Sequence, residues 1–148
     1  MRKKLLLLFV IAVMAVIGLT GCGKFKYDVK DDGIVITEFK DKDAESVVIP
    51  EKIKGRPVIS VGTRTFWCCN NMKEITIPDS VTSIGDEAFA FNNVKEVTIP
   101  GSVTSIGDDA FATSWGEISL FVERGSYAEH WFDNKNNFDR NVVKNYIP

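Results

Sequence analysis

Few residues of this chain have the types and spacing that catalysis needs. The sequence holds a single histidine, His130, and its serines and acidic pairs recur instead of converging on it. Ser83 returns as Ser105, and Asp86 returns as Asp108. A catalytic nucleophile or general acid is a single side chain activated by its particular neighbours. Side chains that recur in the repeat are better explained as turn residues and helix caps. With no glycine-rich phosphate loop and no Gly-x-Ser-x-Gly motif, we expect no enzyme activity and no catalytic residue.

The cysteines carry little metal or disulfide chemistry. Cys68 and Cys69 are adjacent, so oxidation would close a strained ring, and no disulfide framework is expected. Two adjacent thiols and one histidine lack the ligand spacing of a metal site, so we expect neither a metal nor another cofactor. Cys69 is expected to pack as a small apolar residue.

The first 21 residues have the order of a secretion signal. Three basic residues precede an apolar run over residues 5–19, which is shorter than the ~20 residues that span a bilayer. The sequence Leu19-Thr20-Gly21-Cys22 resembles the bacterial lipobox, in which a peptidase cuts before the cysteine and the thiol receives a diacylglyceryl group. The resemblance implies a signal peptide over 1–21 and a lipidated tether over 22–24. It also implies a mature chain anchored to the outer face of a bacterial membrane. An uncleaved anchor helix with an incidental cysteine is the alternative.

The rest of the chain is mildly acidic. The whole sequence has 18 basic and 20 acidic residues, and all the acidic ones follow residue 21, together with 15 of the basic ones. A general nucleic-acid binder needs a concentrated basic face, so we expect no nucleic-acid partner. The length of 148 residues allows one domain.

The body of the chain is a repeat. Residues 72–89, MKEITIPDSVTSIGDEAF, return at 94–111 as VKEVTIPGSVTSIGDDAF. A degenerate copy lies upstream over 47–66, with a looped insertion within 52–56, and Ile118-Ser-Leu120 aligns with Val97-Thr-Ile99 before the pattern stops. A period of 22 residues lies within the leucine-rich-repeat range, in which each turn of the chain adds a layer to a solenoid.

The motifs Ile-x-Ile-Pro, Ser-Val-Thr-Ser-Ile-Gly and Ala-Phe, in that order, resemble the BspA-type leucine-rich repeat of bacterial surface proteins over about residues 47–131. The resemblance implies adhesion to, or binding of, a host or envelope protein. The identity of that protein is unknown because the family shares a scaffold and no common ligand. Two alternatives remain open. One is a purely structural envelope component, and the other is a surface receptor for a glycan or small molecule.

Each position of the repeat has a physical reason. Apolar residues that alternate with threonine predict short strands, and the prolines that follow end them. Gly85 and Gly107 are expected to permit a bend, and Asp86 to cap a short helical turn that carries Phe89 into the core. Phe66, Phe89 and Phe111 are expected to stack in an aromatic column.

These positions predict a leucine-rich-repeat solenoid of the α/β repeat class, β-rich with short helical turns, over residues 46–122. Alternating apolar residues around Asp31-Asp32-Gly33 predict a β-hairpin cap over 25–45. Residues 123–148 are expected to form a C-terminal cap and tail, with a helix over 126–134 on which Tyr127 and Trp131 share a face.

The outward side chains of the predicted strands are expected to form columns. The candidate binding face comprises Glu74, Thr76, Glu96, Thr98, Glu117 and Ser119. An alternative aromatic edge comprises Trp67, Phe91 and Trp115. Threonine also suits strands, and charged residues keep a sheet soluble, so these columns have a plain structural explanation as well.

Overall fold

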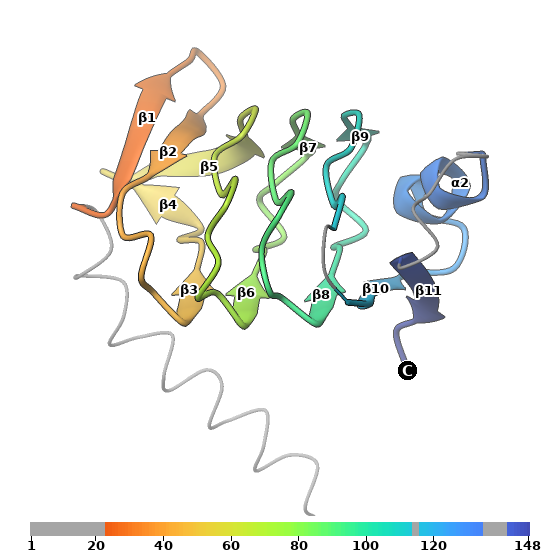
Figure 1. The fold of residues 1–148 in the computed structure, drawn as a ribbon. Coiled ribbons are helices and arrows are strands. Elements are labelled where there is room, and N and C mark those ends of the chain that lie inside the picture. Colours follow the sequence, from red (N-terminus) through yellow and green to blue (C-terminus); the bar gives the residue numbers. More distant parts are fainter. Residues whose placement is uncertain (1–22, 114–115, 135–141) are drawn as a thin grey trace, which may run out of the picture.

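The computed structural model describes residues 23–113, 116–134 and 142–148, which wind into a β-solenoid of about four turns (Figure 1). The predicted lipid site Cys22, with the signal segment, and Trp115 lie outside the described residues. No helix in the described part has both the length and the apolar character needed to cross a bilayer. The winding of the described residues confirms the predicted solenoid.

One side of the solenoid is an upper strand row, in which parallel strands follow an N-terminal hairpin (Figure 1). Its strands in spatial order are β1 (Phe25–Val29), β2 (Ile34–Phe39), β5 (Arg56–Val61), β7 (Ser83–Ile84) and β9 (Ser105–Ile106). The antiparallel hairpin β1–β2 confirms the predicted cap. Because β2 also pairs in parallel with β5, the hairpin contributes the first rung of the row.

The looped insertion is a second, smaller hairpin. Strand β4 (Lys52–Ile53) pairs antiparallel with the start of β5. Lys54 and Gly55, which connect them, both have positive φ angles, of 51° and 79°. Two successive residues with positive φ give the turn whose twist matches that of a two-residue hairpin.

The opposite side is a lower strand row, which is interrupted once along its described length. Its strands are β3 (Ser46–Val48), β6 (Glu74–Thr76), β8 (Glu96–Thr98), β10 (Ile118–Val122) and β11 (Val142–Tyr146). Ladder pairing joins β3 to β6, and β8 to β10 and β11, always in parallel. Strands β6 and β8 lie side by side without a ladder between them (Figure 1).

The register of the fourth coil differs from the sequence alignment by two residues. Val97 pairs with Leu120 instead of Ile118, so Glu96 lies beside Ser119 and Thr98 beside Phe121. Ile118, Leu120 and Val122 are all buried on one face of β10, and this period-two pattern suits either register. The sequence therefore has one more residue between Phe111 and Leu120 than between Phe89 and Val97, the equivalent positions of the preceding coil.

The array also extends beyond the predicted end of the repeat. Strand β11 adds to β10 in parallel and buries Val142, so the C-terminal segment forms a further rung. The helix α2 (Tyr127–Asn134) packs against β9 at the other side of the solenoid. Its buried residues are Ala128 and Trp131, whereas Tyr127, one turn before Trp131 on the same helix face, is exposed.

An aromatic column runs through the core, as predicted. The ring of Phe89 lies 5.2 Å from that of Phe66 and 5.3 Å from that of Phe111, with interplanar angles of 10° and 12°. Phe39 continues the column at the N-terminal end, and Trp131 closes it edge-on against Phe111. Each coil thus covers the apolar ring of its neighbour, which no coil could bury alone.

The segments that carry these rings, 63–68, 86–91 and 108–111, are turns and not the predicted short helical turns. Arg64, Glu87 and Asp109 adopt positive φ angles at equivalent places, which interrupts helical geometry in each coil. The expected capping carboxylate acts between coils, since Asp86 Oδ1 accepts a hydrogen bond from the Asp108 amide 2.8 Å away.

Candidate binding face

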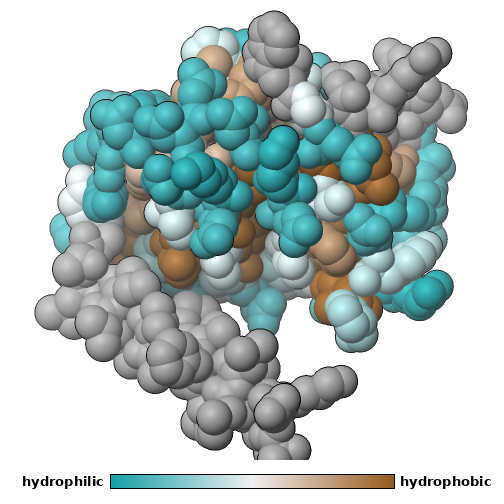
Figure 2. Space-filling view, turned by 60° about the horizontal axis from the view of Figure 1, so that its bottom comes forward, coloured by the Kyte–Doolittle hydropathy of each residue, from teal (hydrophilic) through white to brown (hydrophobic). Residues whose placement is uncertain are grey.

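The lower strand row carries an open groove of about 630 Å³ where its ladder is interrupted. Both walls have the same order of side chains, because β6 and β8 belong to the two repeat copies that are most similar in sequence. A lysine pair, Lys73 and Lys95, is followed by a glutamate pair, Glu74 and Glu96, and then by a threonine pair, Thr76 and Thr98. Figure 2, in which the underside of Figure 1 comes forward, shows this face covered by hydrophilic side chains with apolar surface between them.

The charges of the groove are mostly uncompensated. Lys73 pairs with Glu45 at 3.0 Å, and both side chains are largely exposed. Among the described residues, Glu74, Glu96 and Lys95 have no ion pair. Elsewhere the molecule pairs its coils directly, as in the two-bond contact from Arg64 to Glu87, at 2.7 and 3.0 Å. The groove is therefore a place where charged groups remain available to a partner.

The structure brings five of the six predicted face residues together and separates the sixth. Glu74, Thr76, Glu96 and Thr98 line the groove, and Ser119 lies beside Glu96. Glu117 comes two residues before Ser119, so it is not the third member of the glutamate row. The sequence alignment missed Phe121, which takes the place beside Thr98 that had been assigned to Ser119.

The alternative aromatic edge is only partly described. Trp67 is 42% exposed, and its ring meets Phe91 edge-on at 6.3 Å. The Trp67 carbonyl accepts a hydrogen bond from Lys42 Nζ at 3.3 Å. Trp67 and Phe91 thus form a small fixed aromatic surface on the turn side of the solenoid.

The groups considered for catalysis are dispersed. His130 is exposed on α2, whereas Ser83 and Ser105 pair with each other in the strands β7 and β9. Within the described ranges no cluster of three or more His, Cys, Asp or Glu residues is placed to hold a metal ion. Cys69 is fully buried, as predicted, and burial raises the pKa of its thiol, which makes it a poor nucleophile.

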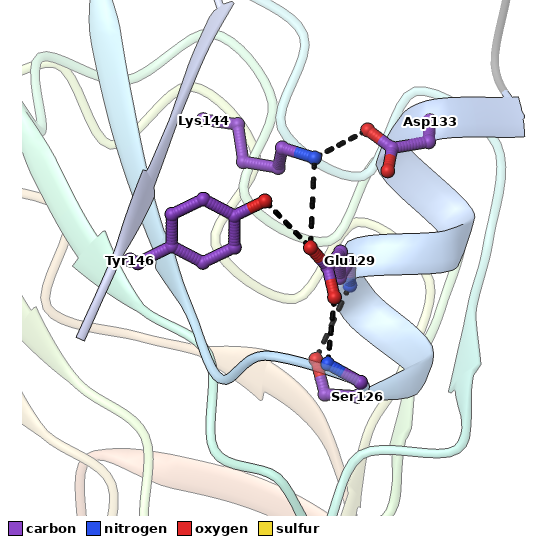
Figure 3. Close-up of polar contacts among 6 residues, drawn as sticks. Ser126, Glu129, Asp133, Lys144 and Tyr146 are labelled. Carbon is purple, nitrogen blue, oxygen red and sulfur yellow. Dashed lines mark hydrogen bonds and ion pairs between the residues drawn. The ribbon is translucent and has the colours of Figure 1, made fainter.

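A polar clamp fastens β11 to α2 at the end of the lower strand row (Figure 3). The Tyr146 hydroxyl donates a 2.6 Å hydrogen bond to Glu129, and the Gly125 amide donates another at 2.6 Å. Lys144 lies between Glu129 and Asp133 and pairs with both. The Glu129 amide bonds Ser126 Oγ, so Ser126 caps the helix.

The clamp predicts acid sensitivity. The hydrogen bond from Tyr146, helped by that from Gly125, lowers the pKa of Glu129 below its ordinary value of 4.5. A carboxyl whose pKa falls on folding stabilises the fold above its unfolded pKa, and this contribution is lost as pH falls through the folded value. We expect Glu129→Gln to weaken the decline of the unfolding midpoint below about pH 5, measured by thermal denaturation at a series of pH values. Glu117→Gln removes a carboxylate outside any described ion pair and is the matched control. An unchanged acid limb in Glu129→Gln would contradict the assignment.

The parallel coils, the inward aromatic column and the strand rows define the class of this molecule, which is the leucine-rich-repeat solenoid. The family model for the BspA type leucine-rich repeat region matches residues 34–145 in six copies. The chain belongs to that family. The match includes β2 and most of β11, in agreement with their parallel pairing in the two strand rows.

Solved structures of two bacterial proteins are similar to this chain at low sequence identity, one of them with a TM-score above 0.5. A leucine-rich cell surface protein from Faecalibacterium prausnitzii is 23% identical, with a TM-score of 0.52 over 70% of this chain and 36% of that one. A leucine-rich repeat protein of T. pallidum is 24% identical, with a TM-score of 0.44 over 69% of this chain and 70% of that one. A search of curated proteins finds no match to the chain.

Proposed function

We propose that this chain is a lipid-anchored bacterial surface protein that binds another protein, from a host or from the envelope, and catalyses no reaction. Family membership supports a binding scaffold, and the Faecalibacterium relative is described as a cell surface protein. The basic and apolar N-terminal segments that end in Leu-Thr-Gly-Cys22 support a lipid anchor at Cys22. With only residues 23–24 between the lipid and β1, the solenoid would lie close to the membrane.

The observation that carries the binding role is the groove on the lower strand row. Its glutamate pair and Lys95 have no ion pair among the described residues, while its threonine pair offers hydroxyl groups beside them. Such groups provide the polar contacts by which a protein partner is recognised and oriented. The proposed contact face is therefore Glu74, Thr76, Glu96, Thr98 and Ser119, without Glu117.

The double change Glu74→Gln and Glu96→Gln is expected to weaken partner binding at least about tenfold while leaving the fold intact, because both side chains are exposed. The test compares proteins captured from envelope and host extracts by the wild type and the variants, with quantitative mass spectrometry. Glu117→Gln is the matched control, since it removes the same charge from the same region outside the groove. The partner retained by the control and lost by the double variant identifies the specific complex. Equal capture by all three proteins would contradict this face.

The aromatic edge gives a second candidate surface. Trp67 is exposed and held edge-on against Phe91, so it offers a rigid platform on which a glycan ring or a protein side chain could stack. Trp67→Ala in the same capture experiment distinguishes the two surfaces. Loss of capture in Trp67→Ala alone would move the site to the aromatic edge, and insensitivity to every change would favour a purely structural envelope component.

A further inference from the structure

We propose that the groove between β6 and β8 binds an extended polypeptide segment lengthwise, with an acidic side chain at the lysine pair, a basic side chain at the glutamate pair and an apolar side chain beyond it. This inference rests on the proposed function, since it names the kind of segment that the protein partner presents.

The direction of the groove follows from its walls. Each wall follows one strand and the residue before it. Lys73 precedes β6, whose residues 74–76 line one wall, and Lys95 precedes β8, of which Glu96 and Thr98 line the other, so the groove runs along the strands. A strand rises about 3.3 Å per residue, which puts the lysine pair about 10 Å from the threonine pair. That length matches three or four residues of an extended segment lying parallel or antiparallel to the two strands.

The charges fix which side chains the segment carries. Two carboxylates on neighbouring strands repel each other, and a shared cation relieves that repulsion. An arginine guanidinium suits this place best because its fork of N–H groups can reach two carboxylates at once. At the other end Lys95 has no carboxylate partner among the described residues, and the exposed pair of Lys73 with Glu45 contributes little that an incoming carboxylate would forfeit.

The far end of the groove is less polar. Phe121 is half-buried beside Thr98, and Ile75, 8% exposed, contributes to the lining next to the threonine pair. A small apolar side chain that follows the basic one would cover this surface. The third contact matters because it breaks the symmetry of a simple charge pair and gives the bound segment one direction.

The same order of charges favours a polypeptide over other polymers. A nucleic acid or a sulfated glycan carries only negative charge, so the lysine pair would attract it and the adjacent glutamate pair would repel it. A neutral glycan would offer hydroxyl groups to both pairs but no opposite charge to either. Successive side chains of an extended segment point to opposite sides, and each charge pair of the groove has one member on each wall, so a segment with adjacent opposite charges meets both pairs. Polypeptides provide such segments.

The location of the groove has a physical reason. Where ladder pairing continues, from β3 to β6 and from β8 to β10, neighbouring strands are joined by their backbones. Only between β6 and β8 does the described lower row lack this pairing, and the groove is found at that place. The strands on either side of this interruption belong to the two repeat copies that are most alike in sequence.

The test uses two fluorescein-labelled synthetic peptides of identical composition, Ser-Glu-Arg-Val-Ser and Ser-Arg-Glu-Val-Ser, and measures binding by fluorescence anisotropy. A charge-swapped variant, Lys73→Glu, Glu74→Lys, Lys95→Glu and Glu96→Lys, keeps the composition and net charge while reversing the charge order of both walls. We expect the wild type to bind the Glu-Arg peptide about tenfold more tightly than the Arg-Glu peptide, and the variant to reverse this preference.

Two outcomes would overturn the inference, namely equal binding of the two peptides, or a preference that the charge swap leaves unchanged. Circular dichroism checks the fold, and a swap limited to Lys95→Glu and Glu96→Lys serves if the fourfold variant does not fold, with a preference reduced about threefold. A different result would contradict the proposed function, namely partner capture that is unchanged by Glu74→Gln and Glu96→Gln. Failure of the peptide test with capture still dependent on those glutamates would mean that the partner uses a folded surface and not an extended segment.

Discussion

Replacement of Phe89 by alanine is expected to lower the free energy of unfolding by about 3–5 kcal/mol. The side chain is 1% exposed and lies in the middle of the aromatic column, between the rings of Phe66 and Phe111. Its removal leaves a cavity that two coils border, and it ends two stacking contacts at once. Since a small domain is stable by only about 5–15 kcal/mol, the loss is a large share of the total. Urea unfolding followed by circular dichroism measures it.

Phe91→Ala is the matched control for this change. Phe91 is the same residue type two positions further on, but it is half-buried at the aromatic edge and does not belong to the column. We expect its loss to be less than half of that at Phe89. A loss under about 1 kcal/mol at Phe89, or equal losses at the two positions, would show that the column does not hold the coils together.

Gly85→Ala is expected to destabilise the fold by about 3 kcal/mol, the upper end of the usual effect of overpacking. A Cβ atom on Gly85 would lie 2.6 Å from the Thr63 amide nitrogen and 2.9 Å from the Gly62 carbonyl carbon. Both neighbours are backbone atoms of the preceding coil, so no side-chain rotation relieves the clash. Relief requires the two coils to separate at the place where β5 pairs with β7.

Gly23→Ala provides the control, because a Cβ atom there meets nothing within 4 Å. We expect its urea unfolding midpoint to remain at the wild-type value, while that of Gly85→Ala falls well below it. A small effect at Gly85 would mean that neighbouring coils are not in contact through this glycine, against the pairing described for the upper strand row.

The repeated core of the fold could be predicted from the sequence because its signals are local and recur. Phe66, Phe89 and Phe111 stand at nearly equal spacing with the same neighbours, and equal spacing in a coiled chain places side chains above one another. The burial of Cys69 could be predicted because the sequence offers it neither an unstrained disulfide partner nor the ligand spacing of a metal site. The role of Gly85 was assigned to a bend, whereas its φ is not positive and close approach of two coils requires it.

The candidate site was less accessible to sequence reasoning, for two reasons. The alternation of Ile118, Leu120 and Val122 suits two registers equally, so Glu117 was counted in a row from which the pairing of Ser119 with Glu96 removes it. The interruption between β6 and β8 has no local signal, because the two strands carry nearly the same residues. Strand β11 lacks the motifs of the repeat and becomes recognisable as a rung only through its pairing with β10.

Site-specific photocrosslinking tests whether the lower strand row at β6 and β8 is the contact face. A photoreactive amino acid replaces Thr98 in the groove or Thr104, an exposed threonine on the other side of the same coil. Each protein is mixed with the captured partner and irradiated. We expect a crosslinked complex from position 98 and none from position 104. Crosslinking from position 104 with none from position 98 would contradict it.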